Sequence, residues 1–219
     1  MQAQTLTKFS KPVTIPANKQ VCYFLDTIPN TEIRLKKGAN LILAALITKG
    51  WEDERQLIIK AQEKNAKCQC IFFILGNNTE KFNANIKAVH NAPNTGIKAK
   101  IRTALTDNAV CHINGDWIIE KGAQGTDTHF ADHTLILSEQ AAAKTSPNLE
   151  IKTDTVKAGH SASVGKIDEE ALFYLLSRGL NETEAKALMV QGFFETELSY
   201  IPDEMLKEKI RKTIQQFLG

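Results

Sequence analysis

Apolar and polar residues alternate one by one through much of the first 157 residues. The ranges 82–88 and 97–103 show this most clearly, because every second position holds an apolar residue or a threonine. Alternation with a period of two places one set of side chains in a core and the other in water, as in a half-buried β-strand. We therefore predict a series of short strands, with further β-like runs at 21–25, 32–35, 41–48, 57–61, 67–75, 109–120, 133–138 and 148–153.

Turn residues separate these runs, for example at Lys37-Gly38, Asn94-Thr95-Gly96 and Asn114-Gly115. Residues 52–64 also fit a short helix, although Leu57-Ile58-Ile59 within them suits a strand. Many short strands joined by such turns are typical of a β-sandwich, a β-barrel or a β-helix. No fixed repeat length is visible, so the pattern leaves these three architectures open.

The pattern changes to a helical one after Gly165. Asp168-Glu169-Glu170 predicts a helix start, because the helix dipole favours acids in the first turn. Arg178-Gly179 predicts its end, with Gly179 in the left-handed region. The apolar face of this helix contains Leu172, Phe173, Leu175 and Leu176.

Two further helices follow. Asn181-Glu182-Thr183-Glu184 resembles a capping box, and a helix from Glu182 to about Glu197 would carry an apolar side made of Ala185, Leu188, Met189 and Phe193. Pro202-Asp203 begins a third helix with one apolar stripe, Leu206, Ile210, Ile214 and Phe217. We predict a β core over residues 1–160 and a helical domain of about three helices over 161–219, docked on the β part.

Composition places the chain among globular proteins. Of 219 residues, 42% are hydrophobic and 24% charged, and the net charge of +2 is too small to favour a nucleic-acid partner. Residues 1–165 hold 20 Lys and Arg against 15 Asp and Glu, whereas residues 166–219 hold 7 against 10.

The longest apolar run, Leu41–Ile47, is far shorter than the ~20 residues that span a bilayer. The first twelve residues also lack the apolar core of a signal peptide. We therefore expect a cytoplasmic protein without a membrane partner, and expect Cys22, Cys68, Cys70 and Cys111 to be free thiols.

Few motifs suggest chemistry. The run from Gly159 to Lys166 departs from a phosphate-binding loop, because it has one residue too many between its glycines and Ile167 in place of the hydroxyl residue. Cys68-Gln69-Cys70 offers two thiols on one strand face without a second ligand pair, so small core residues are the simpler interpretation. His129 and His133 could form a metal site, or line a core or a solvated surface. No catalytic triad or dinucleotide loop is recognisable, and the metal content stays open.

The segment from Gly122 to Phe194 carries a series of short motifs: Leu135-Ile136-Leu137-Ser138, Ala141, Pro147-Asn148-Leu149-Glu150-Ile151, Val156-Lys157-Ala158-Gly159-His160, Val164-Gly165-Lys166-Ile167-Asp168, Leu172-Phe173-Tyr174-Leu175, Ser177-Arg178-Gly179, Ala185 and Gly192-Phe193. In this order and spacing the segment resembles the SufB/SufD family of iron–sulfur cluster assembly proteins, in a short, SufD-like form. The resemblance implies a right-handed parallel β-helix followed by a small C-terminal helical domain. It also implies pairing through the β-helix, with a SufB-like subunit or a second copy of the chain, and docking of a SufC-type ABC ATPase by the helices.

The same resemblance implies that His160 lies near the pairing interface, where a cluster would form. A simpler alternative is that His160 caps the first helix. Ala141, Ala158 and Ser161 stand where family members have candidate ligands, so the resemblance implies no stably bound cofactor and at most a transient iron–sulfur cluster. Cys111 on an upstream strand is a weaker candidate.

The helical tail allows two interpretations. Leu172, Phe173, Leu175, Leu188 and Phe193 suit a core. Tyr174, Arg178, Asn181 and Glu182, at the first helix–helix corner, suit a docking site for the ATPase. We expect a scaffold without catalytic activity. The alternatives are a carbohydrate-active enzyme built on a β-helix and a metal-binding module built on Cys68, Cys70, Cys111 and the histidines.

Overall fold

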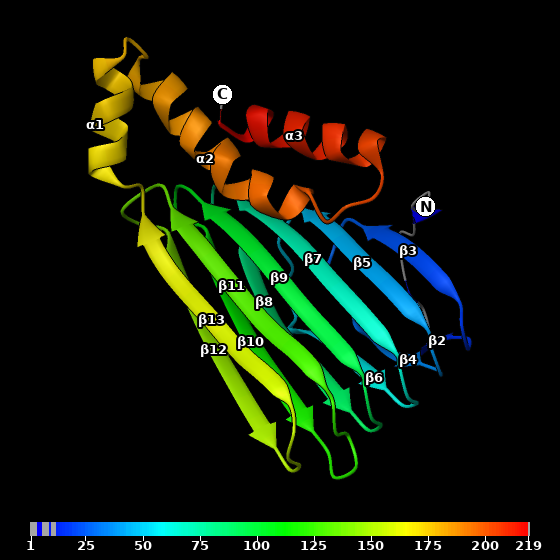
Figure 1. The fold of residues 1–219 in the computed structure, drawn as a ribbon. Coiled ribbons are helices and arrows are strands. Elements are labelled where there is room, and N and C mark those ends of the chain that lie inside the picture. Colours follow the sequence, from blue (N-terminus) through cyan, green and yellow to red (C-terminus); the bar gives the residue numbers. More distant parts are fainter. Residues whose placement is uncertain (1–3, 6–8, 10–11, 219) are drawn as a thin grey trace.

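The computed structural model describes residues 4–5, 9 and 12–218. Within them the chain forms a stack of strands followed by three helices, as Figure 1 shows. The strands are β1 (Gln4–Thr5), β2 (Val13–Ile15), β3 (Gln20–Leu25), β4 (Thr31–Leu35), β5 (Asn40–Ile47), β6 (Arg55–Ala61), β7 (Lys67–Gly76), β8 (Lys81–His90), β9 (Gly96–Leu105), β10 (Val110–Ile119), β11 (Asp127–Ile136), β12 (Ala142–Ile151) and β13 (Lys157–Lys166). The helices are α1 (Glu169–Ser177), α2 (Glu182–Leu198) and α3 (Glu204–Leu218).

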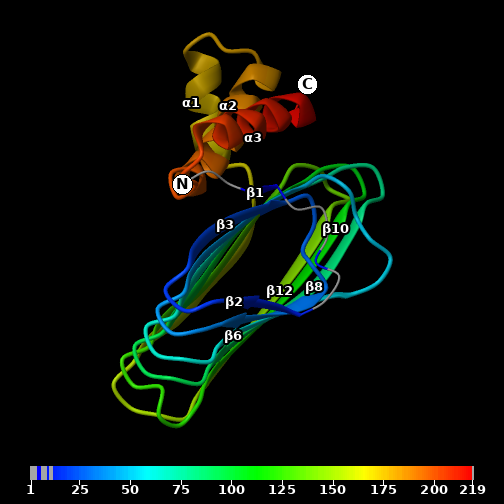
Figure 2. The same ribbon diagram turned by 90° about the vertical axis from the view of Figure 1, so that its right-hand side faces the viewer.

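The strands form two parallel sheets that face each other, as the view along the stack in Figure 2 shows. Odd-numbered strands make a seven-stranded sheet in the order β1-β3-β5-β7-β9-β11-β13, and even-numbered strands make a six-stranded sheet from β12 to β2. Because the chain passes from one sheet to the other at each strand, it winds into a parallel β-helix of about five turns. This confirms the β-helix among the three architectures, and residues 52–64 contain the strand β6 rather than a helix.

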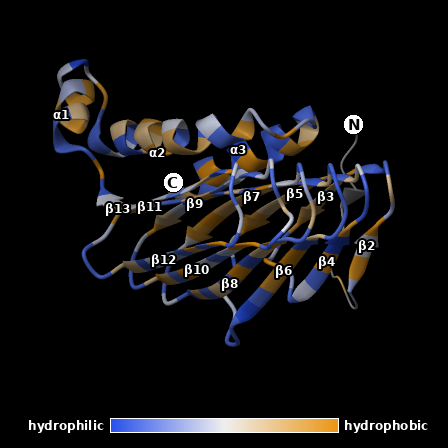
Figure 3. Cartoon of the chain, turned by 60° about the horizontal axis from the view of Figure 1, so that its bottom comes forward, coloured by the Kyte–Doolittle hydropathy of each residue, from blue (hydrophilic) through white to orange (hydrophobic). Residues whose placement is uncertain are grey.

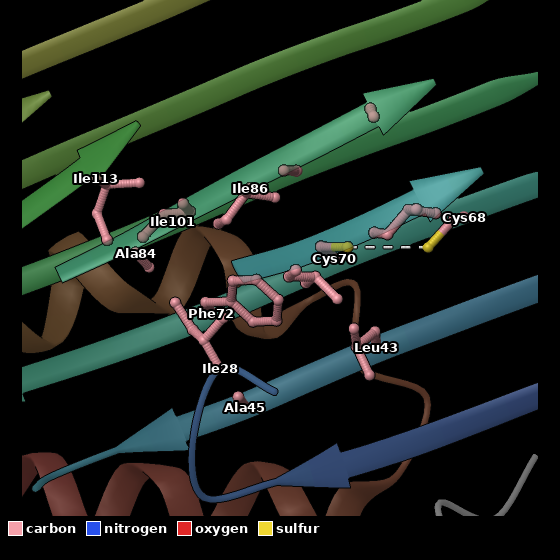
Figure 4. Close-up of a cluster of buried hydrophobic side chains, with 14 of the residues drawn as sticks. Ile28, Leu43, Ala45, Cys68, Cys70, Phe72, Ala84, Ile86, Ile101 and Ile113 are labelled. Carbon is pink, nitrogen blue, oxygen red and sulfur yellow. Dashed lines mark hydrogen bonds between the residues drawn. The ribbon is translucent and has the colours of Figure 1, made fainter. Parts of the chain in front are cut away.

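Equivalent positions of successive turns stack on one another in the interior. Cys68, Cys70 and Phe72 of β7 lie in register with Ile97, Ala99 and Ile101 of β9. All six are buried, and Figure 4 shows the core that they share with neighbouring strands. The alternation seen in the sequence thus marks the side of each strand that faces the interior.

One column of turns holds the coils together. Asn18, Gly38, Asn65, Asn94 and Gly125 each have a positive φ at the equivalent corner of successive turns, as does Thr155. The Asn94 N–H donates to the Gln124 carbonyl at 2.8 Å, and the Asn65 N–H donates to the Pro93 carbonyl at 3.3 Å. Asparagine and glycine recur here because they tolerate the left-handed conformation best.

The helix ends follow the predicted signals. The Asp168 carboxylate accepts hydrogen bonds from the Glu170 and Ala171 amides and caps α1. Gly179 ends α1 with φ +96°, and Asn181 with Glu184 forms the predicted capping box of α2. Strand β13 extends to Lys166. The boundary predicted after residue 160 therefore falls inside β13, and the junction lies at Ile167.

Helices α2 and α3 lie on the outer face of the seven-stranded sheet, over the carboxyl-terminal halves of its strands. Outward-facing apolar residues of β3, β5, β7 and β9 form a second core with the helices, in which the Phe73 and Phe194 rings lie 5.9 Å apart. The stripe predicted on α3 is confirmed, since Leu206, Ile210 and Ile214 are buried.

The predicted apolar side of α2 is only partly correct. The helix buries Ala185, Val190, Phe194 and Leu198, whereas Leu188 is 49% exposed. The reason lies in the sheet, because the apolar outer residues of β5 and β7 select the face that α2 turns towards them.

Buried charge also fixes α2 on the sheet. Glu197 of α2 forms ion pairs with Lys100, at 2.9 Å, and with Arg102, at 3.0 Å, both on β9. The Arg102 guanidinium also stacks on the Phe193 ring at 4.8 Å. A carboxylate that is only 6% exposed is tolerated because two cations share it.

Candidate functional site

The β-helix ends openly at its last two strands. Within the described residues, β12 and β13 each pair on one side only, so their outer edges present free backbone groups. Val164 of β13 and Ile151 of β12 are each 47% exposed. An unpaired strand edge beside exposed apolar side chains is a surface suited to pairing with another chain.

His160 lies at this open end. It is on β13 in register with Phe130 of β11, whose side chain is buried in the interior. His160 therefore shares the inner side of the sheet, yet it is exposed because no described residue adds a further strand beyond β13. The helix-capping alternative is excluded, since Asp168 caps α1.

The residues at the other ligand positions do not form a site together. Ala158 shares the inner side of β13 with His160, whereas Ser161 faces outward, between His129 and His133. Ala141 is buried in the turn before β12. None of the three carries a metal-binding group comparable to a thiolate or an imidazole.

Cys111 is buried in the interior on β10, 2% exposed, and lies near Asp132. Burial, reinforced by the nearby Asp132 charge, raises the pKa of the Cys111 thiol far above its usual range. A thiol that stays protonated at neutral pH is a poor metal ligand.

The remaining candidate ligands lie on opposite sides of the seven-stranded sheet: Cys68 and Cys70 on the inner side, His129 and His133 on the outer side. Cys68 and Cys70 lie side by side in the core, as Figure 4 shows, and both are buried. Their sulfur atoms are 3.8 Å apart. The hydrogen-bonding contact between the Cys68 and Cys70 thiols, together with burial, raises the pKa of Cys68. His129 and His133 instead lie on the outer face. No group of three or more His, Cys, Asp or Glu side chains within the described part of the chain could hold a metal ion.

His129 and His133 converge on one hydroxyl group. The Ser161 Oγ lies 3.3 Å from His129 Nε2 and 3.5 Å from His133 Nε2, and His133 Nδ1 is 2.7 Å from the Ser163 Oγ. Burial lowers the pKa of both histidines. The positive charge of Lys98 lowers the pKa of His129 further, and that of Arg102 lowers the pKa of His133 further. The pair is therefore a neutral, hydrogen-bonded surface feature between β11 and β13.

One buried carboxyl lies near the open end. Asp132 of β11 is 1% exposed, and its Oδ2 accepts a hydrogen bond from the Thr145 hydroxyl at 2.7 Å. Its Oδ1 is buried without a hydrogen-bond partner among the described residues. Burial raises the pKa of Asp132 to about 6, so its protonation state changes close to neutral pH.

The second exposed surface is made by α1 and the adjoining part of α2. No residue of α1 is buried, and Phe173 is 72%, Tyr174 56% and Leu176 37% exposed. We call these three residues, together with the exposed Leu188 of α2, the α1 patch. Figure 3 shows α1 standing out from the rest of the molecule with apolar segments uncovered. The core interpretation of Phe173 and Leu188 is therefore wrong, because α1 reaches past the end of the sheet that would cover it.

The predicted corner residues differ in their roles. Arg178 stacks on the Tyr174 ring at 5.0 Å, which leaves both at the edge of the α1 patch. Asn181 uses its side chain to cap α2, and Glu182 pairs with Lys186 at 2.5 Å. Phe173, Leu176 and Leu188 were missed as surface residues. Their helical spacing indicates an apolar face but not whether that face is covered.

No helix in the described ranges is both long and apolar enough to cross a membrane.

Comparison with known proteins agrees with the fold. A family model described as the SufBD core domain of SUF-system FeS cluster assembly matches residues 26–193. The chain is 42% identical over 105 residues to an iron–sulfur cluster assembly SufBD family protein of Mycobacterium leprae. The aligned region covers 48% of this chain and 27% of that protein. It is 37% identical over 112 residues to the iron–sulfur cluster assembly protein SufD of Bacillus subtilis, with 51% of this chain and 26% of that protein covered. It is 34% identical over 117 residues to SufD of Escherichia coli, with 53% and 28% covered. The matches thus span about a quarter of the length of these relatives.

Proposed function

This chain belongs to the SufBD family of iron–sulfur cluster assembly proteins, and we propose that it is a SufD-like scaffold that has no catalytic activity of its own and acts in the cytoplasm. In this role it would pair with another β-helix and dock a SufC-type ABC ATPase. The two exposed surfaces described above, at the open end and on α1, supply one site for each partner.

The open end of the β-helix supports the pairing. The edges of β12 and β13 can extend both sheets across an interface, and the exposed Val164 and Ile151 side chains would be buried against the partner. The partner would be a SufB-like subunit or a second copy of this chain. His160 would then lie inside the joint between the two solenoids.

A cluster would be cargo at this joint rather than a resident cofactor. His160 is the residue of this chain best placed to contact it, since Ala158 and Ser161 supply no strong ligand and the Cys111 thiol is buried and protonated. Thiolate ligands would therefore have to come from the partner subunit.

The α1 patch supports the ATPase docking. An aromatic and aliphatic surface edged by arginine has the composition of an interface hot spot, and α1 contributes nothing to the core that would explain its apolar face. The exposure of Phe173 and Tyr174 is the observation that carries this part of the proposal.

Size-exclusion chromatography with light scattering, of the chain mixed with the SufC-type ATPase of its own source, tests the docking. We expect a stoichiometric complex for the wild type and its loss for Phe173→Ala combined with Tyr174→Ala. Met205→Ala is the control, because Met205 is 86% exposed on α3, outside the patch. A complex that survives the double substitution would refute the patch, and a wild type that ignores the ATPase would refute the docking role.

A further inference from the structure

A polar groove lies on the outer face of the seven-stranded sheet, on the part that α2 and α3 leave uncovered. It has a volume of about 720 Å³, and its walls come from β5, β7, β9, the turn before β11 and the segment after α2. The side chains that matter for its chemistry are Asn40, Lys67, Gln69, Lys98, Lys100 and Tyr200. The groove belongs neither to the open end of the β-helix nor to the α1 patch.

Three lysines face this groove from two adjacent strands. Lys98 and Lys100 are two positions apart on β9, and Gln69 of β7 lies in register beside Lys98. Side chains so placed project from the same face about 7 Å apart along a strand and about 5 Å apart between strands. Asp127, which pairs with Lys98 at 2.8 Å, is the acid among the groove residues. The groove therefore presents several cations at the spacing of the charges on a multiply charged small molecule.

Lys100 is held in place by its surroundings. Its Nζ lies 2.9 Å from the buried Glu197 carboxylate and 3.6 Å from the centre of the Tyr200 ring. Glu197 also pairs with Arg102, so one negative charge is shared between two cations and the local charge stays positive. A cation fixed by packing loses little entropy when a ligand binds to it.

A histidine on the neighbouring strand β11 lies close to the same positive charges. His129 of β11 lies in register beside Lys98, on the same outer face. Burial and the charges of Lys98, His160 and Lys100 lower the pKa of His129, which is what surplus positive charge does to an imidazole.

We propose that this groove binds a small polyanion, a molecule that carries two or more phosphate or carboxylate groups. Asn40 lies in register beside Lys67 and Gln69 beside Lys98, so their amides offer hydrogen-bond donors next to the lysines. Most of the lining residues are polar or charged and Tyr200 is the aromatic one among them, which favours a highly charged small molecule over an apolar peptide. Such a site goes beyond scaffolding, because it would bring a soluble anion to a face that neither proposed partner occupies.

Isothermal titration calorimetry at low ionic strength tests the site, with pyrophosphate and citrate as probes for the phosphate and carboxylate forms. We expect one saturable site per chain for at least one probe. Lys67→Gln combined with Lys98→Gln should weaken binding about tenfold or more, because two charge-assisted contacts are lost. Lys81→Gln combined with Lys144→Gln, which removes the same charge from exposed lysines of the other sheet, should bind as the wild type does.

Amide chemical shifts locate the ligand in the same samples. Perturbations on adding the probe should concentrate at Gly96, Lys98 and Lys100. The proposal is overturned if neither probe saturates a site, if both double variants lose affinity equally, or if the perturbations spread over the whole surface. Those outcomes would leave the scaffold function untouched, because they involve neither the open end nor α1.

Discussion

At the scale of single residues, Asp132 is a charged side chain in a place that suits a neutral one. Its carboxyl is buried near the open end of the β-helix, accepts one hydrogen bond from Thr145, and has a pKa raised to about 6 by burial. In the unfolded chain the same group titrates near its usual 3.8. At a pH between these two pKa values, Asp132 is protonated in the folded protein and ionised in the unfolded chain. The folded state therefore loses stability as the pH rises from 3.8 to about 6.

We therefore expect Asp132→Asn to stabilise the protein above pH 7 by up to about 3 kcal/mol, because an amide needs no proton to remain neutral. The gain should shrink as the pH falls from 6 towards 4, where Asp132 is itself protonated in the folded state. Urea denaturation across this pH range measures the difference in the free energy of unfolding. Asp154→Asn, at an exposed position, is the control and should change little. A stability difference that is constant with pH would contradict the assignment.

Gly115 is a residue whose missing side chain matters. A Cβ built there would lie 2.8 Å from atoms of the Phe130 ring, which packs on Trp117. We expect Gly115→Ala to lower the free energy of unfolding by about 1–3 kcal/mol, because the ring must move within a close-packed core. Gly192→Ala on α2 is the matched control. Its Cβ would meet nothing within 4 Å, and alanine should stabilise the helix by about 0.5–1 kcal/mol. Chemical denaturation of both variants measures the two effects, and a neutral Gly115→Ala would show that the core is looser than described.

At the scale of elements, the sequence predicts best where a strand or helix has one buried side. Strand β9 alternates cleanly because its inner residues Ile97, Ala99 and Ile101 are buried and its outer lysines meet water. The helix starts at Asp168 and Asn181 were predictable because capping is local chemistry. Burial depends on distant partners, however, so Phe173 and Leu188 could not be distinguished from core residues by their spacing.

The repeat of the β-helix was hidden for a related reason. The left-handed corner residues Asn18, Gly38, Asn65, Asn94 and Gly125 mark successive turns, but the early turns are shorter than the later ones. A fixed period is therefore absent, although the same corner recurs. The candidate site was only partly visible too. His160 lies on β13, the last strand of its sheet. Its exposure follows from the missing next strand in the described residues, which no local pattern encodes.

The contact between α2 and the sheet depends on Glu197. We expect Glu197→Gln to lower the free energy of unfolding by about 1.5–3 kcal/mol, because Lys100 and Arg102 lose their shared charge partner in a partly buried place. Hydrogen exchange should show the loss first in α2 and α3, while β7 and β9 stay protected.

Glu195→Gln, on the same helix, is the control for this effect. Its pair with Arg211 is much more exposed and should contribute at most about 1 kcal/mol. Equal destabilisation by the two substitutions would show that the buried position of Glu197 confers no special role.

At the scale of the whole molecule, the proposed partner surfaces lie at the same end of the stack but on different elements. The open edges belong to β12 and β13, and the α1 patch belongs to the helix that follows β13 directly. Only Ile167 and Asp168 separate β13 from α1. A movement of α1 imposed by a docked ATPase would therefore be transmitted by a very short connection to the strand that carries His160.

This arrangement predicts that the two associations can be broken separately. Val164→Lys combined with Ile151→Lys should abolish pairing at the open end, because two ammonium groups would have to be buried against the partner. The same variant should still bind the ATPase, since the α1 patch is intact. Met205→Lys, the control at an exposed position of α3, should change neither association. Light scattering of the chain alone and with a SufB-like subunit measures pairing, with a homodimer at twice 24.3 kDa. Pairing that persists in the Val164→Lys, Ile151→Lys variant would place the interface elsewhere, and simultaneous loss of the ATPase would show that the two surfaces form one site.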